Sequence, residues 1–337
     1  MLQNDNEIYK EVLLKGISQR KRIEDIIGQL FREREIDRLY LVGCGGSLAV
    51  MLPCKYIMDQ YSTLPTQVYN ASEFETLLPK SFSERALVIV SSYSGKTPET
   101  VTVANLARER GAATIGFMGT ADSPLGKAVD YAFANDAPIG VTDSKIIMLY
   151  QILFNILRVR GETSDYDRLM SAMDTLPENL AAIKNQAEPF AENFAQRYKD
   201  EEYFMVLGAG IGWGEAYAYA ICILEEMQWI KAQPVHAGEF FHGSFEIVRE
   251  DTNLLLFKGE DASRPLGERA ERFARTYSKK VTVVDTEDYA LPGVDEKFRA
   301  FFTPLILSAV MDRVSKNLEA ARDHSLKLRK YMGIVSY

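Results

Sequence analysis

Hydroxyl side chains crowd around one glycine in the first half of the sequence. Gly95 is flanked by four of them: Ser91, Ser92, Ser94 and Thr97. The group follows an apolar run and precedes a segment with helical spacing. Amides in the first turn of a helix are unpaired and the helix dipole attracts anions, so hydroxyls placed there can hold a phosphate without a metal ion. The alternative is that Ser94 or Thr97 only caps the helix.

A Gly-rich turn, residues 43–47 (Gly-Cys-Gly-Gly-Ser), follows an earlier apolar run. It lacks the third glycine of a dinucleotide-binding turn, and the Gly-Lys-Ser/Thr of a Walker site is absent, so it only weakly indicates nucleotide binding. The corresponding loop of the second half, residues 258–265, lacks the hydroxyl cluster. We therefore expect only the first half to bind a phosphate.

Glu226 and His242 are the best candidates for proton transfer. The sequence contains three histidines, and two of them, His236 and His242, follow Glu226 closely. Glu225 and Glu226 lie about 100° apart on a helix, so one of them must face a polar space. Glutamate and histidine are common general acids and bases near neutral pH. The alternatives are a solvated glutamate and a packed histidine, and the histidines lack partners at metal-ligand spacing.

Short apolar runs alternate with segments of helical spacing along the chain. We expect buried strands at residues 38–42, 86–90, 113–117, 203–207, 254–257 and 281–284. Strands that alternate with helices in this way indicate an α/β fold with parallel sheets covered on both faces. Residues 5–34 are expected to form one or two amphipathic helices.

Three landmarks of this pattern recur along the chain. The pairs are Gly43 and Gly208 (208 minus 43 is 165), Leu87 and Leu254 (167 apart), and Ala113 and Val281 (168 apart). A near-constant offset suggests an internal duplication, although ordinary strand-helix units could coincide by chance. The expected organisation is N-terminal helices at 1–35, a phosphate-binding domain at 36–165, a helical connector at 166–198, a second domain at 199–320 and a polar, basic tail at 321–337.

Composition excludes several classes of protein. The chain has 337 residues, 47% of them hydrophobic, and a net charge of 39 − 47 = −8. Two packed domains fit this length, and the negative charge argues against nucleic-acid and membrane partners. Three widely spaced cysteines indicate a reducing compartment, and no signal peptide or apolar run of about 18 residues is present. We therefore expect a cytoplasmic protein.

The motifs resemble those of the sugar isomerase (SIS) family of phosphosugar-binding proteins, and within it the fructosamine 6-phosphate deglycases. Residues 92–97 (Ser-Tyr-Ser-Gly-Lys-Thr) match the family's Ser-x-Ser-Gly-x-Thr signature. The 16 residues from Glu226 to His242 (242 minus 226) are similar to the spacing of the catalytic pair in deglycases and in the isomerase half of glucosamine 6-phosphate synthase. Further matching segments are 42–47, 69–74, 91–100, 226–230, 236–243, 245–247 and 329–332.

The resemblance implies two tandem SIS domains, each a flavodoxin-like three-layer α/β sandwich. It implies a 6-phosphate bound by Ser47, Ser92, Ser94 and Thr97 with the amide of Tyr93. Glu226 would be the general base, and His242 would open the sugar ring or donate a proton. Further implied substrate contacts are Gly45, Gly46, Ser144, His236 and Lys330. No cofactor or metal is expected.

The implied partners are a small phosphosugar–amino acid substrate and further copies of the chain. Two subunits commonly share a site in this family, which implies a homodimer or a higher oligomer and leaves open whether His242 acts within its own subunit. Glucosamine synthesis is not expected. Ile223 stands where the synthase-like isomerases have a lysine, and no glutamine-hydrolysing domain fits before residue 38.

The implied reaction is the conversion of a 6-phosphorylated sugar–amino acid conjugate and water to glucose 6-phosphate and an amino acid, by way of an enolamine and an imine. The conjugates of lysine, asparagine and aspartate with fructose 6-phosphate, and glucoselysine 6-phosphate, all remain open. An aldose–ketose phosphosugar isomerase is the first alternative, since it would use the same Glu226 and His242 without releasing an amine. A phosphosugar sensor without catalysis is the second.

Overall fold

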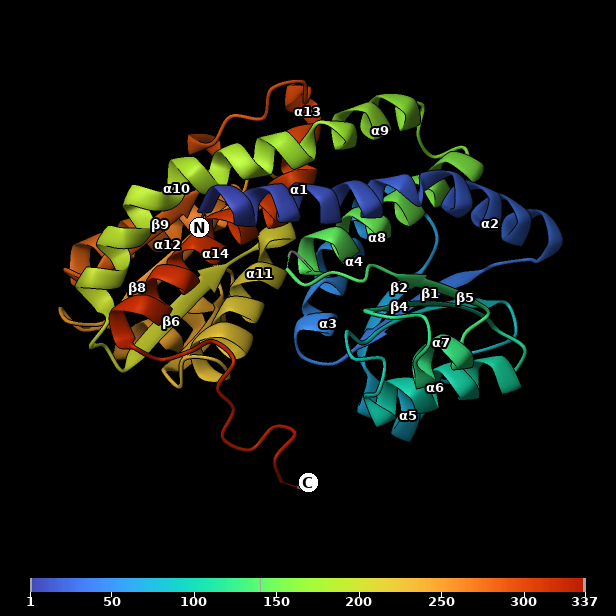
Figure 1. Cartoon of the computed structure of the whole chain (residues 1–337), viewed down its shortest axis with the longest axis horizontal. Helices are drawn as coiled ribbons and strands as arrows, with labels where there is room; N and C mark the ends of the chain where they lie inside the picture. The colour runs from blue at the N-terminus through green and yellow to red at the C-terminus, as the bar shows by residue number, and fades with distance from the viewer. Residues whose placement is uncertain (1, 140, 336–337) are drawn as a thin grey trace. The chain divides into compact units, whose positions relative to one another are not determined.

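The computed structural model describes residues 2–139 and 141–335, so residues 336–337 of the expected tail lie outside it. The chain divides into two compact units, Met1–Pro177 and Glu178–Tyr337. The division falls within the first turn of helix α10 (Leu176–Tyr198), which Figure 1 labels.

The first unit is built on a five-stranded parallel sheet with the strand order β2-β1-β3-β4-β5. Its strands are β1 (Arg38–Gly43), β2 (Thr66–Asn70), β3 (Ala86–Ser91), β4 (Ala113–Met118) and β5 (Tyr131–Ala134). All residues of β3 and β4 are buried, as in a parallel sheet covered on both faces. The three strands expected in this half are confirmed, and the sequence reading missed the two edge strands, β2 and β5.

Helices cover both faces of this sheet. They are α1 (Leu2–Ser18), α2 (Arg20–Glu33), α3 (Gly46–Ala49), α4 (Met51–Tyr61), α5 (Ala71–Leu77), α6 (Pro98–Glu109), α7 (Pro124–Ala128), α8 (Val141–Val159) and α9 (Tyr166–Asp174). Helix α4 packs against α8, which is backed by α1 and α2, whereas α5, α6 and α7 lie on the opposite face (Figure 1). Alternate residues of β1 and β3, such as Val42 and Val88, pack against Val103 and Ala107 of α6.

The second unit is built on a four-stranded parallel sheet with the order β7-β6-β8-β9. Its strands are β6 (Tyr203–Gly208), β7 (Lys231–His236), β8 (Leu254–Lys258) and β9 (Val281–Asp285). Three of them were expected and are confirmed. The fourth, β7, contains Pro234, which lacks a backbone donor and is tolerated at the edge position that β7 holds.

Helices cover this sheet as well. They are α10, α11 (Trp213–Ala218), the π-helix η2 (Tyr219–Glu225), α12 (Arg264–Tyr277), α13 (Glu296–Arg299) and α14 (Thr303–Arg322). Short 3-10 helices are η1 (Gly210–Gly212), η3 (Phe240–His242), η4 (Ser244–Ile247), η5 (Thr286–Asp288) and η6 (Ala300–Phe302). On one face, Met205 and Leu207 pack in a cluster with Ala270 of α12. On the other, Phe204 stacks on Phe194 of α10 with ring centroids 5.9 Å apart.

The two sheets repeat one topology. The order β2-β1-β3-β4 in the first corresponds to β7-β6-β8-β9 in the second. Arg38 and Tyr203, which begin β1 and β6, are 165 residues apart, and Ala113 and Val281, which begin β4 and β9, are 168 apart. The repeated topology agrees with the duplication suggested by the sequence.

No helix in the described part of the chain is both long enough and apolar enough to cross a membrane.

Candidate active site

The two polar turns of the first half begin at neighbouring positions of one sheet edge. Gly43, the last residue of β1, lies opposite Ser91, the last residue of β3. Strand β2 lies on the far side of β1, and β4 lies on the far side of β3, so the strand order runs in opposite directions on the two sides of this pair. Such a point, where the strand order reverses, is the usual ligand site of an open parallel sheet.

The hydroxyl cluster is assembled at this edge. The Ser92 hydroxyl lies 2.8 Å from that of Thr97 and 3.4 Å from that of Ser94. Thr97 occupies the N-cap position of α6, but its side chain makes no capping hydrogen bond. The Ser94 hydroxyl instead accepts a bond from the amide of Lys96 at 3.1 Å. Simple capping by Thr97 therefore does not explain the cluster, and Ser92 and Thr97 face each other at the start of the helix.

Gly95 gives this loop its shape. Its φ of +62° lies in the left-handed region, and its amide donates to the carbonyl of Ser92 at 3.1 Å. A Cβ at this position would lie 2.3 Å from the Ser123 hydroxyl, so no other residue fits without movement. The side chain of Tyr93 is exposed, while its carbonyl accepts a bond from Gly119 at 2.8 Å.

The Gly-rich turn after β1 places Ser47 beside the same edge. Gly45 has a φ of +54° and precedes the short helix α3, which begins at Gly46. The amide of Ser47 donates to the carbonyl of Cys44 at 3.0 Å, which closes the turn. Ser47 is half-buried with its hydroxyl in contact with a lysine.

That lysine, Lys145 of α8, was not anticipated from the sequence. Its ammonium donates to the Ser47 hydroxyl at 3.3 Å and to the Ser91 hydroxyl at 3.4 Å, and the residue is only 3% exposed. A buried lysine is costly to charge unless polar or anionic groups surround it. The signal available in the sequence was a lysine directly before the largely apolar run of residues 146–157, which the structure shows to be buried.

Ser144, the expected substrate contact, is fully buried and faces another helix. A Cβ placed on Gly16 of α1 would lie 3.0 Å from the Ser144 hydroxyl. A contact between Ser144 and a substrate therefore stays a prediction, and the neighbouring Lys145 is the α8 residue that reaches the hydroxyl cluster.

In the second unit, a π-helix leads directly into Glu226. The amide of Glu226 donates to the carbonyl of Ile221, five residues earlier, at 3.0 Å. Single π turns inside helices are frequent at functional sites because they re-aim the side chains that follow. The Glu225 carboxylate accepts a bond from the amide of Ala232 at 3.3 Å, whereas Glu226 forms an ion pair with Arg329 at 2.9 Å. The two adjacent glutamates thus face different partners.

The two histidines follow β7, whereas Glu226 precedes it. His236 ends the strand, accepts a bond from the amide of Gly238 at 3.1 Å and contacts the ring of Trp213. His242 is exposed at the end of η3, and within the described residues no hydrogen bond or ion pair joins it to Glu226. Residues 2–139 and 141–335 contain no group of three or more His, Cys, Asp or Glu side chains that could hold a metal ion.

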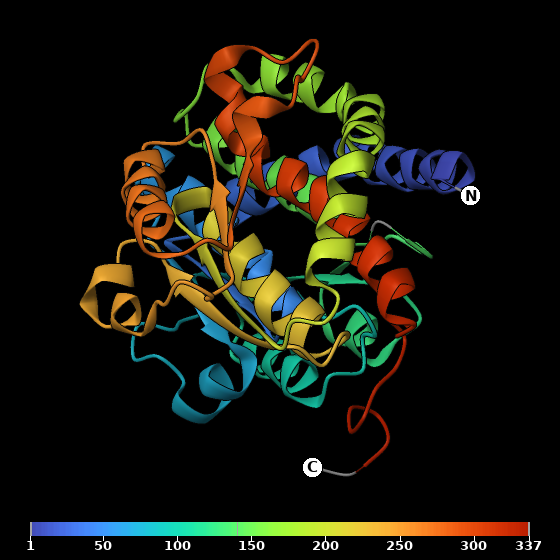
Figure 2. The same cartoon turned by 90° about the vertical axis from the view of Figure 1, so that its left-hand side faces the viewer.

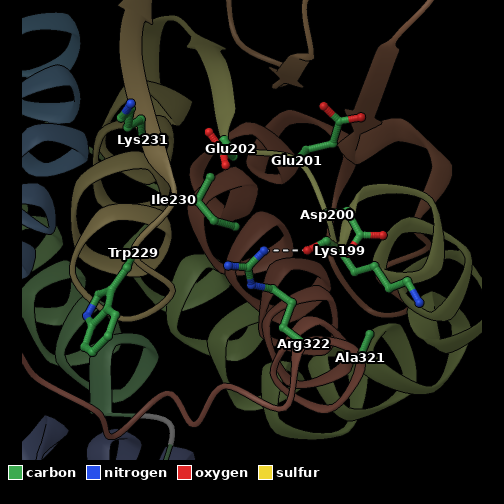
Figure 3. Close-up of a pocket in the computed structure, with 9 residues that line it drawn as sticks. All are labelled: Lys199, Asp200, Glu201, Glu202, Trp229, Ile230, Lys231, Ala321 and Arg322. Atoms are coloured by element: carbon green, nitrogen blue, oxygen red, sulfur yellow. Dashed lines mark hydrogen bonds between the residues drawn. The ribbon is translucent and has the colours of Figure 1, made fainter.

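Lys330, another expected contact, lies beside an aromatic ring. Its ammonium is 5.6 Å from the centre of the Trp229 ring. Trp229 also borders a pocket of about 480 Å³ in the second unit (Figure 3), whose lining is Lys199, Asp200, Glu201, Glu202, Trp229, Ile230, Lys231, Ala321 and Arg322. None of the expected site residues lines this pocket, so it is separate from the proton-transfer candidates.

The loop of the second half that corresponds to the hydroxyl cluster contains ion pairs. Arg264 binds both carboxylate oxygens of Asp285, at 2.9 and 2.7 Å, and Lys258 contacts the same carboxylate at 2.9 Å. Burial alone would raise the pKa of Asp285, but the hydrogen bonds from Arg264 and Lys258 lower it below its usual value. The charges of these residues are therefore paired with one another, and a phosphate site confined to the first half stays a prediction.

Comparison with known proteins places the chain in a family. Residues 34–158 match the model of the SIS domain. The fructosamine deglycase of Bacillus subtilis is 36% identical over 313 residues, which cover 92% of this chain and 95% of that protein. The fructoselysine 6-phosphate deglycase of Escherichia coli is 26% identical over 90% of this chain and 88% of its own length.

A solved structure from Bacillus subtilis, provisionally described as a phosphosugar isomerase, superimposes with a TM-score of 0.88. It is 35% identical and covers 94% of this chain and 97% of its own. The chain therefore belongs to the SIS-domain family, in the group that contains the fructosamine and fructoselysine 6-phosphate deglycases.

Proposed function

We propose that this protein is a deglycase that hydrolyses a sugar 6-phosphate joined to the nitrogen of an amino acid. The observation that carries the proposal is the 36% identity with fructosamine deglycase over nearly the full length of both chains. The hydroxyl cluster of the first unit and the glutamate after the π-helix of the second supply the two chemical functions that this reaction requires.

We assign the phosphate to the carboxyl ends of the neighbouring strands β1 and β3. Ser92 and Thr97 present hydroxyls at the start of α6, where unpaired amides favour an anion. Ser47 adds a third hydroxyl, and Lys145 behind it supplies a positive charge. This set binds a phosphate through hydrogen bonds and one buried cation, which explains how a chain of net charge −8 can take an anionic ligand.

The reaction needs one proton removed and one returned. In the open-chain fructosamine, Glu226 takes a proton from C1. The released electron pair forms a C1–C2 double bond while the π pair of the C2 carbonyl moves to its oxygen, which takes up a proton, and the product is an enolamine. Reprotonation at C2 moves the double bond to C1 and nitrogen. Water adds to this imine, the C–N bond breaks, and glucose 6-phosphate and the amino acid leave. The C2 carbonyl oxygen takes up the electron pair in the first step, and the nitrogen lone pair forms the C=N bond in the second, so the proposed reaction uses no metal.

His242 is proposed as the acid that opens the ring or returns the proton. It follows β7 and is exposed, while Glu226 precedes the strand. This separation supports a site completed by a second copy of the chain. The test mixes the inactive variants Glu226→Gln and His242→Gln. If the site is shared, half of the dimers in an equal mixture contain one copy of each variant, and each such dimer has one intact site, so the mixture should regain up to about a quarter of wild-type activity. A mixture that is as inactive as each variant alone would contradict a shared site.

The substrate is tested by assaying both products. We expect the enzyme to release an amino acid and glucose 6-phosphate in equal amounts from fructosamine 6-phosphates. The substrates to compare are those in which the sugar is joined to the α-amino nitrogen of the amino acid and those in which it is joined to the ε-amino nitrogen of lysine. An aldose–ketose isomerase is the second candidate, favoured by the description of the 35% identical solved structure. Interconversion of fructose 6-phosphate and glucose 6-phosphate without amino acid release would support the isomerase. Tight binding of either phosphosugar without any turnover would support a sensor.

The cysteine content supports a proposal for the cellular location. Three widely spaced cysteines favour a reducing compartment, and we propose the cytoplasm, where a phosphorylated substrate would be retained. Fractionation of cells that produce the tagged protein tests this proposal.

A further inference from the structure

The chain after α14 folds back onto the turn that carries Glu226. This C-terminal segment, residues 323–331, contains no helix or strand, and both cartoon views show it as an irregular chain (Figures 1 and 2). Within it, Arg329 places one guanidinium nitrogen 2.9 Å from Oε1 of Glu226. Both side chains are about three-quarters buried, at 23% and 24% exposure. The contact is therefore partly shielded from the solvent that weakens surface ion pairs.

The guanidinium of Arg329 is held on its other edge by the segment itself. The second terminal nitrogen, Nη1, donates to the carbonyls of Leu326 at 2.8 Å and Leu328 at 2.7 Å. A planar guanidinium can satisfy these carbonyls and a carboxylate together, whereas a lysine ammonium has no such fixed fork. Arg329 therefore has a defined orientation before it meets Glu226.

The segment is also attached to its surroundings. The amide of Leu326 donates to the carboxylate of Glu319 in α14 at 2.9 Å. The side-chain amide of Gln228, two residues after Glu226, donates to the carbonyl of His324 at 3.2 Å, and the ring of His324 lies edge-on to Trp229. The segment therefore contacts the Glu226 turn in three places: Arg329 at Glu226, and His324 at Gln228 and at Trp229.

We propose that Arg329 is a positioning residue for the general base, an inference that rests on the proposed function of Glu226. The ion pair uses Oε1 of Glu226, and no hydrogen bond to Oε2 is found within residues 2–139 and 141–335. One oxygen is held in a charge-assisted bond, and the other is available to take the proton from carbon. Arg329 fixes the orientation of the carboxylate.

The first test measures kcat and KM of Arg329→Gln and Arg329→Lys on a fructosamine 6-phosphate. A misplaced base slows proton transfer, so we expect kcat to fall about 10²-fold in Arg329→Gln, with KM within threefold. Arg329→Lys should lose less, because it keeps the charge. Lys327→Gln, which removes an exposed cation from the same segment, is the control and should retain wild-type kcat. A kcat of Arg329→Gln within threefold of wild type would overturn the proposal.

Two further measurements separate positioning from a purely structural role. Added guanidinium should restore part of the activity of Arg329→Ala without activating the wild type. In the Glu226→Gln background, Arg329→Gln should cause little further loss, because the group that it positions is gone. Arg329 would be assigned to folding alone if Arg329→Gln lowered activity as much in the Glu226→Gln background as in the wild type. The same conclusion would follow if guanidinium restored no activity to Arg329→Ala and that variant unfolded at a lower temperature. A wild-type protein without deglycase or isomerase activity would refute the proposed function and this inference together.

Discussion

Replacing Lys145 by methionine removes the buried cation behind the hydroxyl cluster and retains a side chain of similar length. The lysine lies 3.3 Å from the Ser47 hydroxyl that is proposed to bind the phosphate. A phosphate oxygen hydrogen-bonded to that hydroxyl would place the charge at about 5 Å from the ammonium. We therefore expect Lys145→Met to weaken the binding of sugar phosphates while the fold persists.

The size of the effect follows from Coulomb's law. Two unit charges at about 5 Å and an effective dielectric constant of about 20 interact by roughly 3 kcal/mol. That free energy corresponds to a change in Kd of roughly 10²-fold. The second charge of the phosphate would add to this value, and water entering the space left by the ammonium would reduce it.

The assay is calorimetric titration of the variant with glucose 6-phosphate. Lys96→Gln is a matched control, because Lys96 is an exposed cation in the same loop and should alter Kd by less than threefold. Thermal unfolding of Lys145→Met should remain a single cooperative transition, which shows that the variant is folded when its binding is compared with that of the wild type. A folded Lys145→Met protein that binds glucose 6-phosphate within threefold of wild type would refute the assignment of Lys145 to the phosphate site.

Two further predictions concern the first unit. Burial alone would raise the pKa of Glu162, but hydrogen bonds from Arg160, Ser62 and Thr63 lower it to about 2. The ionised Glu162 therefore stabilises the folded protein above the unfolded pKa of about 4.3, and this contribution is lost as the pH falls toward 2. Glu162→Gln should therefore lower the free energy of unfolding by up to about 3 kcal/mol at pH 7 and by much less near pH 2, and an equal loss at both values in denaturant titrations would contradict this. Gly95→Ala should impair glucose 6-phosphate binding and lower the unfolding temperature more than Gly161→Ala, because both have positive φ but only Gly95 would meet another residue; equal effects of the two variants on stability and binding would contradict the crowding argument.

The central strands and the clustering of the hydroxyls could be predicted because both are local in sequence. The runs that became β3 and β4 are mostly apolar and fully buried, and a near-continuous apolar run is typical of a strand buried on both faces. The hydroxyls of Ser92, Ser94 and Thr97 lie within six residues, so a single turn brings them together. The edge strand β7 was missed because it is partly exposed and contains Pro234, a residue that argues against a central strand.

The residues that the sequence reading missed lie directly beside residues that it named. Lys145 reaches the hydroxyl cluster, whereas the named Ser144 faces α1, and Arg329 binds Glu226, whereas the named Lys330 lies at Trp229. Neighbours on a helix point about 100° apart, so the face that each presents depends on how the helix packs. For Arg329 the orientation depends on an irregular segment, for which the sequence offers no periodic pattern.

The most direct test of the account compares wild type and Glu226→Gln on one fructosamine 6-phosphate, with the amino acid and glucose 6-phosphate measured in the same reaction. The wild type should release the two products in a one-to-one ratio. Glu226→Gln should bind the substrate with similar affinity but turn over at least about 10²-fold more slowly, since a general base contributes roughly 10² to 10⁴ in rate. A folded Glu226→Gln protein with more than about a tenth of wild-type activity, or a wild type that interconverts hexose phosphates without releasing amino acid, would contradict the account.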